Sequence, residues 1–269
     1  TRYLRLNEGQ GVHSEYHPDH LNYGGPWQQF LAGPFFYEGK RPEDITRIGI
    51  VGLAAGTTAR QADEVFPFVI IDGWEIDPKI VQVGKDYFDM NLPNLNIFIQ
   101  DGRWGLEQSN ELYDLVIVDA YRPPYIPPHL TTQQFFQEVA AHLTENGVLA
   151  INVGRSPTDR TLINDLASTI QTVFPSVYVV DVPYSYNTMI YATRQLTHPA
   201  NLAENLLLLS ALGDVHPLLI ESLQIAVVNI QSTPPIDVIY TDDWSPIEWV
   251  TNSMVLNTVL FGDLDQIGE

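Results

Sequence analysis

The amino-acid sequence predicts an α/β fold built on a doubly wound, mostly parallel β-sheet. Short apolar segments such as 48–51 and 115–118 alternate with segments of helical length. Continuously apolar strands separated by helices are typical of a parallel sheet that helices cover on both faces. Small residues at 52–56 follow the first strand, and acidic residues follow the next three. Two adjacent apolar segments, 177–182 and 188–192, indicate an antiparallel pair at one edge of the sheet.

The predicted elements divide the chain into three segments. Residues 1–44 are expected to form a β-hairpin followed by an apolar helix, 45–195 the α/β domain, and 196–269 a helical C-terminal extension. The pair Asn146-Gly147 is expected to end a helix before the fifth strand of the sheet. The seven strands of the sheet are predicted at 48–51, 69–75, 96–99, 115–118, 148–153, 177–182 and 188–192. Helices are predicted at 27–33, 57–65, 78–87, 132–143, 162–174, 201–212, 217–230 and over a last segment that ends near 260.

The composition restricts the classes of partner. The chain carries 33 acidic and 13 basic residues, which gives a net charge of −20. This charge repels phosphate backbones, so we expect no nucleic-acid partner, and it favours cationic ligands such as amines. A surface adapted for solubility or salt explains the same charge equally well. The chain lacks cysteine, which excludes disulfides, thiolate zinc sites and cysteine nucleophiles.

The sequence also bears on metals and on location. His13, His17 and His20 lie in a turn-rich segment without a carboxylate at ligand spacing, so we predict no metal site. No apolar run reaches the length of a membrane span, and no signal peptide is visible. The expected location is cytoplasmic. Because the chain begins at Thr1 rather than Met, we expect it to be a trimmed or excised piece of a longer protein.

The strand ends carry residues suited to a nucleoside cofactor, because ligands of doubly wound sheets bind at the carboxyl ends of the strands. Small residues in the 52–56 turn allow the backbone to approach a ligand closely. Glu75 is placed to accept ribose hydroxyls, Asp101 to accept the adenine amine, and Asp119 to lie at the reacting group. A tight turn or a solvated acid explains each feature alone, but together they predict nucleoside binding. The predicted cofactor-binding residues are Gly52, Ala54, Gly56, Thr57, Glu75, Asp101, Gly102 and Asp119.

These motifs resemble the spermidine synthase (polyamine aminopropyltransferase) family, which is related to class I methyltransferases. The resemblance covers residues 1 to about 193 and rests on the 52–56 turn, Glu75-Ile-Asp77-Pro78, Asp101-Gly-Arg103 and Leu115-Val-Ile-Val-Asp119. It implies a seven-stranded, Rossmann-like (class I methyltransferase-like) sheet that binds an adenosyl sulfonium. The implied cofactor is S-adenosylmethionine or its decarboxylated form, with S-adenosylhomocysteine or methylthioadenosine as the product and no metal. A small-molecule amine substrate and a homodimer are implied as well.

The resemblance also shows where this chain departs from the family. Ala55 stands where the family has an acid in the first loop, and Arg122 stands where it has the second of two acids after the fourth strand. Arg122 either binds a carboxylate of the cofactor or acceptor, or points outward to a surface acid. Asp119 matches the first acid and is predicted to act as a base or to orient the amine. Tyr121 is predicted to wall the pocket, so the predicted catalytic residues are Asp119, Arg122 and Tyr121.

The residues predicted to bind the acceptor lie in two distant segments. Tyr23 matches a tyrosine that covers the substrate in the family, and His13 lies near the position of a glutamine that this chain lacks. In the C-terminal extension, Asp242 and Asp243, together with Glu248, are candidates to replace the missing acids and receive an amine. A helix cap is the alternative explanation of these acids. Similar endings belong to spermidine-synthase-like domains fused to membrane segments, so a membrane-fused parent is a second expectation for location.

The sequence therefore predicts a spermidine-synthase-like transferase that uses an adenosyl sulfonium to alkylate an amine. Aminopropyl transfer in polyamine synthesis is the leading hypothesis. An S-adenosylmethionine-dependent methyltransferase is the first alternative, and a non-catalytic nucleoside-binding or interaction module is the second.

Overall fold

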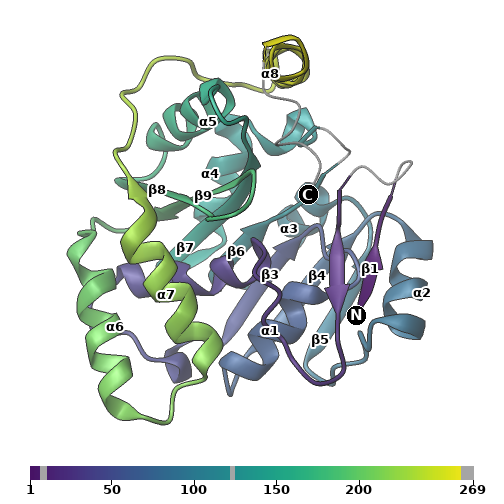
Figure 1. Cartoon of the computed structure of the whole chain (residues 1–269), viewed down its shortest axis with the longest axis vertical. Helices are drawn as coiled ribbons and strands as arrows, with labels where there is room; N and C mark the ends of the chain where they lie inside the picture. The colour runs from purple at the N-terminus through teal and green to yellow at the C-terminus, as the bar shows by residue number, and fades with distance from the viewer. Residues whose placement is uncertain (7–10, 122–124, 262–269) are drawn as a thin grey trace.

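The computed structural model describes residues 1–6, 11–121 and 125–261, without the side chains of 257–261. It contains a sheet of eight strands in the order β10-β8-β9-β7-β6-β3-β4-β5, and a separate hairpin that pairs β1 with β2 (Figure 1). The strands are β1 (Arg2–Leu4), β2 (Ser14–Tyr16), β3 (Arg47–Val51), β4 (Ile70–Glu75), β5 (Leu95–Ile99), β6 (Tyr113–Val118), β7 (Leu143–Gly154), β8 (Ser176–Asp181), β9 (Asn187–Thr193) and β10 (Ile230–Gln231).

The strand order reverses beside β3, and this reversal positions the site. Strands β7, β6, β3, β4 and β5 are parallel, whereas β9, β8 and β10 join antiparallel. The chain runs from β3 outward to β4 and β5, then returns to β6 on the other side of β3. Ligands of doubly wound sheets bind at the carboxyl ends next to such a reversal. Gly52 follows β3 and Asp119 follows β6, so both residues lie at this point.

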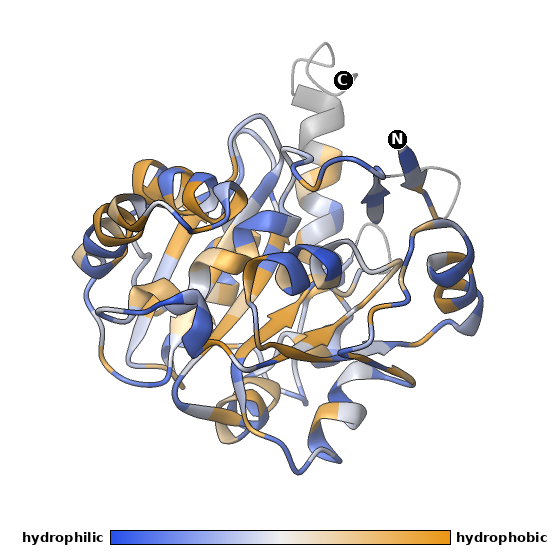
Figure 2. Ribbon diagram, turned by 90° about the horizontal axis from the view of Figure 1, so that it is seen from below, coloured by the Kyte–Doolittle hydropathy of each residue, from blue (hydrophilic) through white to orange (hydrophobic). Residues whose placement is uncertain are grey.

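Helices cover both faces of the sheet, and the hydrophobic strands lie between the helical layers (Figure 2). Elements η2, α1, α2, α6 and α7 contribute to the core on one face, and α3, α4 and α5 to the core on the other, where α8 packs against α5. The helices are η2 (Trp27–Phe36), η3 (Pro42–Asp44), α1 (Thr57–Val65), α2 (Pro78–Tyr87), α3 (Gly102–Glu107), η4 (Pro128–Leu130), α4 (Gln133–Ala141), α5 (Thr161–Gln171), α6 (Ala200–Leu212), α7 (Pro217–Asn229) and α8 (Ile247–Phe261).

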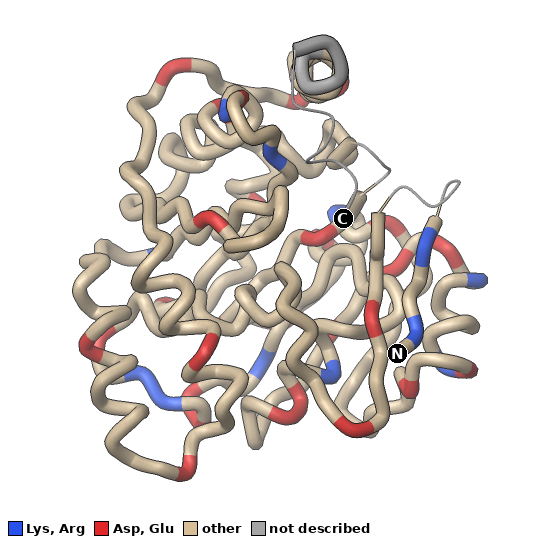
Figure 3. The backbone as a smooth tube through the Cα atoms, in the orientation of Figure 1, with Lys and Arg blue, Asp and Glu red and all other residues tan. Residues whose placement is uncertain are grey.

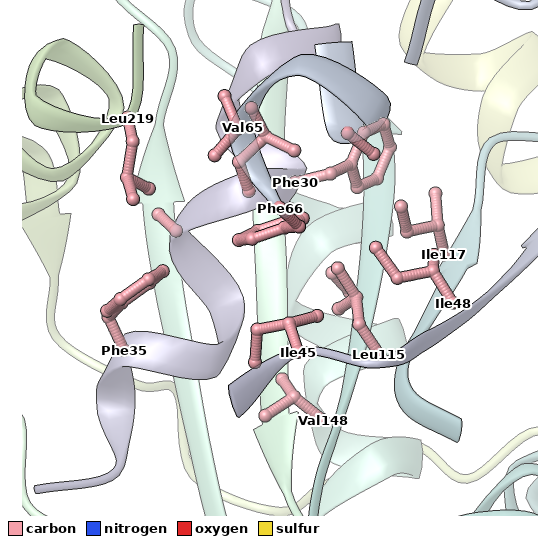
Figure 4. Close-up of a cluster of buried hydrophobic side chains, with 14 of the residues drawn as sticks. Phe30, Phe35, Ile45, Ile48, Val65, Phe66, Leu115, Ile117, Val148 and Leu219 are labelled. Atoms are coloured by element: carbon pink, nitrogen blue, oxygen red, sulfur yellow. The ribbon is translucent and has the colours of Figure 1, made fainter. Parts of the chain in front are cut away.

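One hydrophobic cluster joins residues from all three predicted segments of the chain. Phe30 and Phe35 of η2, Leu115 of β6 and Leu219 of α7 are fully buried in it, and Figure 4 shows these side chains in one close-up. Burying a side chain of this size contributes about 1.5–3 kcal/mol to folding. The apolar residues of 27–36 and of the C-terminal helices therefore complete the core of the sheet.

The mostly parallel α/β fold predicted from the sequence is confirmed, with differences at particular elements. Helices α1 and α2 have the bounds predicted from the sequence, and all seven predicted strands are present. The eighth strand, β10, and helix α3 were missed. The prediction that Asn146-Gly147 ends a helix was wrong, because β7 already begins at Leu143. The pairing of β7 with β6 shifts register in this region, and a Cβ on Gly147 would lie 2.8 Å from the carbonyl oxygen of Tyr113.

The surface carries the negative charge that the composition gives. Acidic positions are scattered over helices and loops and outnumber the basic ones in the view of Figure 3. Within the described residues, no helix combines the length and apolar character that crossing a membrane requires.

Candidate active site

The turn after β3 brings its backbone against the end of β6. Gly52 has a φ of +91°, and a Cβ there would lie 2.7 Å from backbone atoms of Asp119 and Ala120. Gly56 also has a positive φ, of +81°, and precedes α1, where a Cβ would meet the side chain of Met90. Glycine is required at 52 because any side chain would separate the two strand ends that form the site.

Glu75, at the end of β4, is fixed by backbone amides. One carboxylate oxygen accepts a hydrogen bond from the N–H of Ala54 at 2.9 Å, and the other accepts from the N–H of Asp77 at 3.0 Å. Glu75 is buried, and desolvation by burial raises its pKa despite these hydrogen bonds. Asp77 caps α2 by accepting from the N–H of Lys79 at 2.8 Å. Each oxygen of Glu75 retains lone pairs that can accept hydroxyl groups.

Asp101 follows β5 and begins α3. Its Oδ1 accepts from the N–H of Trp104 at 3.0 Å, and its Oδ2 lies 2.9 Å from Nε2 of His129. Gly102 packs against β3, since a Cβ there would lie 2.5 Å from a methyl group of Val51. The carboxylate of Asp101 thus holds the start of α3 and the segment around His129 together at the edge of the site.

Asp119 is half-buried at the end of β6 and is bonded to β7. Its Oδ1 accepts from Nδ2 of Asn152 at 3.0 Å. Burial raises the pKa of Asp119 to about 6, because desolvation disfavours the carboxylate more than the Asn152 hydrogen bond favours it. Tyr121 donates its hydroxyl to the carbonyl of Asn152 at 2.9 Å and accepts from the N–H of Gly154 at 2.8 Å. Burial also raises the pKa of Tyr121, so it remains a phenol.

Two cavities meet at these residues. The first has a volume of about 570 Å³ and the second about 530 Å³. The first is lined by the predicted cofactor residues Gly52, Ala54, Glu75, Asp101, Gly102 and Asp119. The second is lined by residues of the N-terminal unit and by Asn152, Gly154, Tyr186 and Asn187. Among the described residues, four line both cavities: His13, Ala54, Asp119 and Tyr121.

Two predicted cofactor residues, Gly56 and Thr57, are not among those that line either cavity. The Thr57 hydroxyl accepts from the N–H of Glu15 and donates to its carbonyl, both at 2.9 Å. It therefore attaches β2 to α1. Ala55 is fully buried beneath the same turn, and its N–H donates to Oγ of Ser14 at 3.0 Å. The turn holds the N-terminal hairpin in place as well as approaching the cavity.

The predicted acceptor residues of the N-terminal unit are separated by the structure. His13 lines both cavities; its Nε2 is buried without a hydrogen-bond partner, and burial lowers its pKa. Tyr23 lines neither cavity, and its hydroxyl accepts from the N–H of His17 at 3.3 Å. Its ring contacts Trp27 edge-on, with centroids 6.4 Å apart. Trp27, which lines the second cavity, occupies the wall and Tyr23 lies outside it.

The predicted acidic residues of the C-terminal extension are also separated, because only one of them lines a cavity. Asp242 binds Arg103 through two hydrogen bonds of 2.8 Å, and Arg103 lowers the pKa of this carboxyl. Neither Asp242 nor Asp243 is among the residues that line the cavities, whereas Glu248, in the first turn of α8, lines the first one. Asp242 is therefore engaged by Arg103 rather than directed at an amine. Arg122 lies outside the described residues.

Sequence reasoning missed several residues that line the cavities. Asn152 is the clearest, because a buried polar residue inside the apolar strand β7 is a signal that the sequence contains. Trp27 and Tyr186 were not identified, since aromatic residues in apolar or loop segments are more often packing residues. Among residues 1–6, 11–121 and 125–261, no group of three or more His, Cys, Asp or Glu side chains is arranged to hold a metal ion.

The comparisons with known proteins identify the family. The model of the spermine/spermidine synthase domain matches residues 50–204, more than half of the chain. The chain therefore belongs to the spermine/spermidine synthase family, as its motifs predicted. A probable polyamine aminopropyl transferase of Bifidobacterium longum is 34% identical over 148 residues, which are 54% of this chain and 33% of that protein. The polyamine aminopropyltransferase of Vibrio vulnificus is 32% identical over 160 residues, 57% of this chain and 50% of that protein.

Methyltransferases are similar to the same region. The human eEF1A lysine and N-terminal methyltransferase is 27% identical over 155 residues, 53% of this chain and 22% of that protein. The chain thus spans no more than half the length of these three relatives.

Two solved structures share the fold. A probable spermidine synthase from Corynebacterium glutamicum aligns with a TM-score of 0.60 and 17% identity, over 85% of this chain and 76% of that chain. Human methyltransferase-like protein 13 in complex with SAH aligns with a TM-score of 0.59 and 22% identity, over 77% of this chain and 93% of that chain.

Proposed function

We propose that this chain is an adenosyl-sulfonium-dependent transferase that alkylates a small amine, with aminopropyl transfer as the leading reaction. The observation that carries the proposal is the position of Asp119. This half-buried carboxylate lines both cavities, so it lies where a cofactor in the first would meet an acceptor in the second.

The first cavity suits the cofactor. Glu75 has oxygens available to ribose hydroxyls, and Asp101 and Gly102 lie at the edge where the adenine would bind. The 52–56 turn brings backbone close to the ligand because Gly52 has no side chain. A solved spermidine synthase contains the transition-state analogue AdoDATO, and methyltransferase-like protein 13 contains SAH. We propose S-adenosylmethionine or its decarboxylated form for this chain.

The proposed step transfers a carbon from sulfur to nitrogen. The acceptor ammonium first gives a proton to the Asp119 carboxylate. The free nitrogen lone pair then forms a bond to the carbon attached to sulfur. The C–S bond breaks, and its electron pair stays on sulfur, which becomes a neutral thioether. Alignment of the two substrates and exclusion of water supply most of the acceleration in such a displacement.

Methyl transfer is the second candidate, because the human methyltransferase relative is similar over more than half of this chain. The two reactions leave different nucleosides. Aminopropyl transfer from the decarboxylated cofactor leaves methylthioadenosine, whereas methyl transfer leaves S-adenosylhomocysteine. A non-catalytic module would bind a cofactor and release neither.

Mass spectrometry of the nucleoside formed from each cofactor with a panel of amines tests the proposal. We expect methylthioadenosine, and we expect Asp119→Asn to lower kcat by about 10²–10⁴-fold, the range for a lost proton-transfer group. Asp243→Asn is the matched control, since it makes the same change at an exposed acid outside both cavities. Absence of binding to either cofactor in calorimetry, or unchanged turnover in Asp119→Asn, rejects this assignment.

We further propose that the chain forms a homodimer, as the family resemblance implies. Light scattering of the purified chain tests this proposal, with twice the mass of 30.3 kDa as the expected result. A monomer at micromolar concentration contradicts it.

A further inference from the structure

The first cavity receives one residue from outside the matched family domain. The match to the spermine/spermidine synthase model ends at residue 204, whereas Glu248 belongs to the first turn of α8 in the C-terminal extension. Among the described residues that line this cavity, Glu248 is the one that follows residue 204. The C-terminal extension therefore adds a carboxylate to the wall of the proposed cofactor site.

The C-terminal extension is fixed to the loop that forms this part of the cavity wall. The hydroxyl oxygens of Thr131 and Ser245 lie 3.0 Å apart. One turn after Glu248, the side chain of Asn252 accepts a hydrogen bond of 2.6 Å from the hydroxyl of Tyr125, which lines the cavity. Residues four positions apart lie on the same face of a helix. The face of α8 that carries Glu248 is therefore the face that contacts this loop.

Glu248 differs from the other carboxylates of the cavity because its side chain has no partner in the protein. The other four accept hydrogen bonds from backbone N–H groups or from side chains of the described residues: Glu75, Asp77, Asp101 and Asp119. Within the part of the chain that the structure describes, the Glu248 carboxylate accepts no hydrogen bond and forms no ion pair. Arg103 is not its partner, since it is bound to Glu138 and Asp242. The Glu248 carboxylate is thus available to a ligand.

The proposed cofactor carries a group that suits this carboxylate. Both S-adenosylmethionine and its decarboxylated form have a primary ammonium on the chain attached to sulfur. An ammonium that enters a cavity loses part of its hydration, and a charge-assisted hydrogen bond to a carboxylate offsets this loss. Among the described residues that line the cavity, there is no lysine or arginine to repel the ammonium. Because the proposal assigns Glu75 to the ribose, Asp101 to the adenine and Asp119 to the acceptor, Glu248 is the acid that remains for this group.

We propose that Glu248 binds the primary ammonium of the cofactor, and that the C-terminal extension thereby completes the cofactor cavity. This inference rests on the proposed function and adds a cofactor-binding residue to it. Binding both the ribose and the ammonium restricts the positions that the carbon attached to sulfur can take, which favours its alignment with the acceptor.

Two thioethers of adenosine test the inference because they differ in one terminal group. The aminopropyl thioether ends in an ammonium and the butyl thioether in a methyl group, and neither has a sulfonium that could react. Calorimetry on the whole chain should give a lower Kd for the aminopropyl thioether. Glu248→Gln should raise that Kd by about fivefold, as expected for the loss of a partly exposed ion pair, and should change the Kd of the butyl thioether by less than about twofold.

Two further variants are controls for charge and for position. Glu248→Asp retains the carboxylate and should keep part of the preference for the aminopropyl thioether. Asp243→Asn removes one negative charge from an exposed position of the same extension, outside both cavities, and should keep all of the preference.

The outcomes separate ligand binding by Glu248 from a structural role. An acid in the first turn of a helix also stabilises the helix through its dipole, and loss of that role would weaken binding of both thioethers equally. Equal weakening, or an unchanged Kd of the aminopropyl thioether in Glu248→Gln, overturns the inference and leaves the transferase proposal in place. If the unsubstituted chain binds neither thioether and does not bind methylthioadenosine, the proposed cofactor and the inference are rejected together.

Discussion

At the scale of single residues, the site is built from groups whose burial opposes stability. The ordinary pKa of an aspartate is 3.8, and burial raises that of Asp119 to about 6. The carboxylate is therefore less favourable in the folded protein than in the unfolded chain, yet it is still the main form of Asp119 at neutral pH. This property suits a group that must take a proton from an amine.

The raised pKa of Asp119 predicts a pH-dependent loss of folding stability. Between 3.8 and about 6 the folded protein binds more protons than the unfolded chain, so stability falls as pH rises through this window. Below pH 3.8 this loss of stability is absent, and above about pH 6 it has its full value. Without ligands at pH 7.5, we expect Asp119→Asn to be more stable by about 3 kcal/mol, from about two pKa units at 1.4 kcal/mol each. Urea unfolding at pH 7.5 and pH 4 measures this, and an equal gain at both pH values would count against it.

The same group predicts the pH dependence of activity. Because the carboxylate accepts the proton, kcat/KM should rise with pH through an apparent pKa of about 6 and level off above it. The Asp119→Asn variant should lack this limb. A profile that is flat between pH 5 and pH 7 in the unsubstituted protein contradicts the role of Asp119.

Gly52 makes a separate prediction about backbone geometry. Gly52→Ala places a Cβ 2.7 Å from the backbone at 119–120 in addition to requiring a positive φ. Gly213→Ala is the matched control, since Gly213 has a φ of +76° and nothing within 4 Å of its Cβ position. We expect about 1 kcal/mol of destabilisation at 213 and about 3 kcal/mol or more at 52. Cofactor affinity, measured by calorimetry, should fall only for Gly52→Ala.

At the scale of elements, hydrophobic periodicity and helix caps predicted the position of most helices and strands. The elements that were not predicted, α3 and β10, were missed for physical reasons. Helix α1 follows small residues and α2 begins with Pro78 after the Asp77 cap, so both could be read locally. Helix α3 has six residues, too few for a periodic pattern. Strand β10 consists of two residues that pair with β8 across more than 40 positions of sequence. Such an element depends on its neighbour rather than on its own residues.

Arg103 connects three elements at the edge of the first cavity. Its guanidinium bonds Glu138 of α4, Asp242 before α8, and the carbonyl of His129. We expect Arg103→Gln to cost about 1 kcal/mol, because Asp242 is partly exposed and screened. Hydrogen exchange at the backbone amides of 241 and 244 should accelerate, and cofactor affinity should fall because Glu248 is no longer held in position. Lys85→Gln controls for net charge. Unchanged exchange at these amides argues against a connecting role.

At the scale of the whole molecule, one core spans segments that the sequence separates. The cluster around Phe30, Leu115 and Leu219 includes η2, the sheet and α7. We therefore expect Leu219→Ala to destabilise the protein by about 2–5 kcal/mol, the range for a fully buried leucine. Leu207→Ala on α6, where the side chain is 73% exposed, is the control and should change stability by less than about 0.5 kcal/mol. Unfolding followed by circular dichroism and by tryptophan fluorescence should show one coincident transition. Separate loss of α6 and α7 would instead support an independent unit at 196–269.

The sequence by itself determined where the strands of the sheet lie along the chain and which chemical groups follow them. These are local features, which can be recognised from a short stretch of sequence alone: the alternating apolar segments, the small-residue turn, and the acids Glu75, Asp101 and Asp119. Only the tertiary structure decided which of the candidate residues meet. It placed Asn152 against Asp119 and His13 in the wall of the same cavities, paired Asp242 with Arg103, and set Trp27 rather than Tyr23 in the cavity wall. The physical reason is that a cavity is formed by side chains from distant segments, and their meeting depends on packing across the sheet rather than on any local pattern.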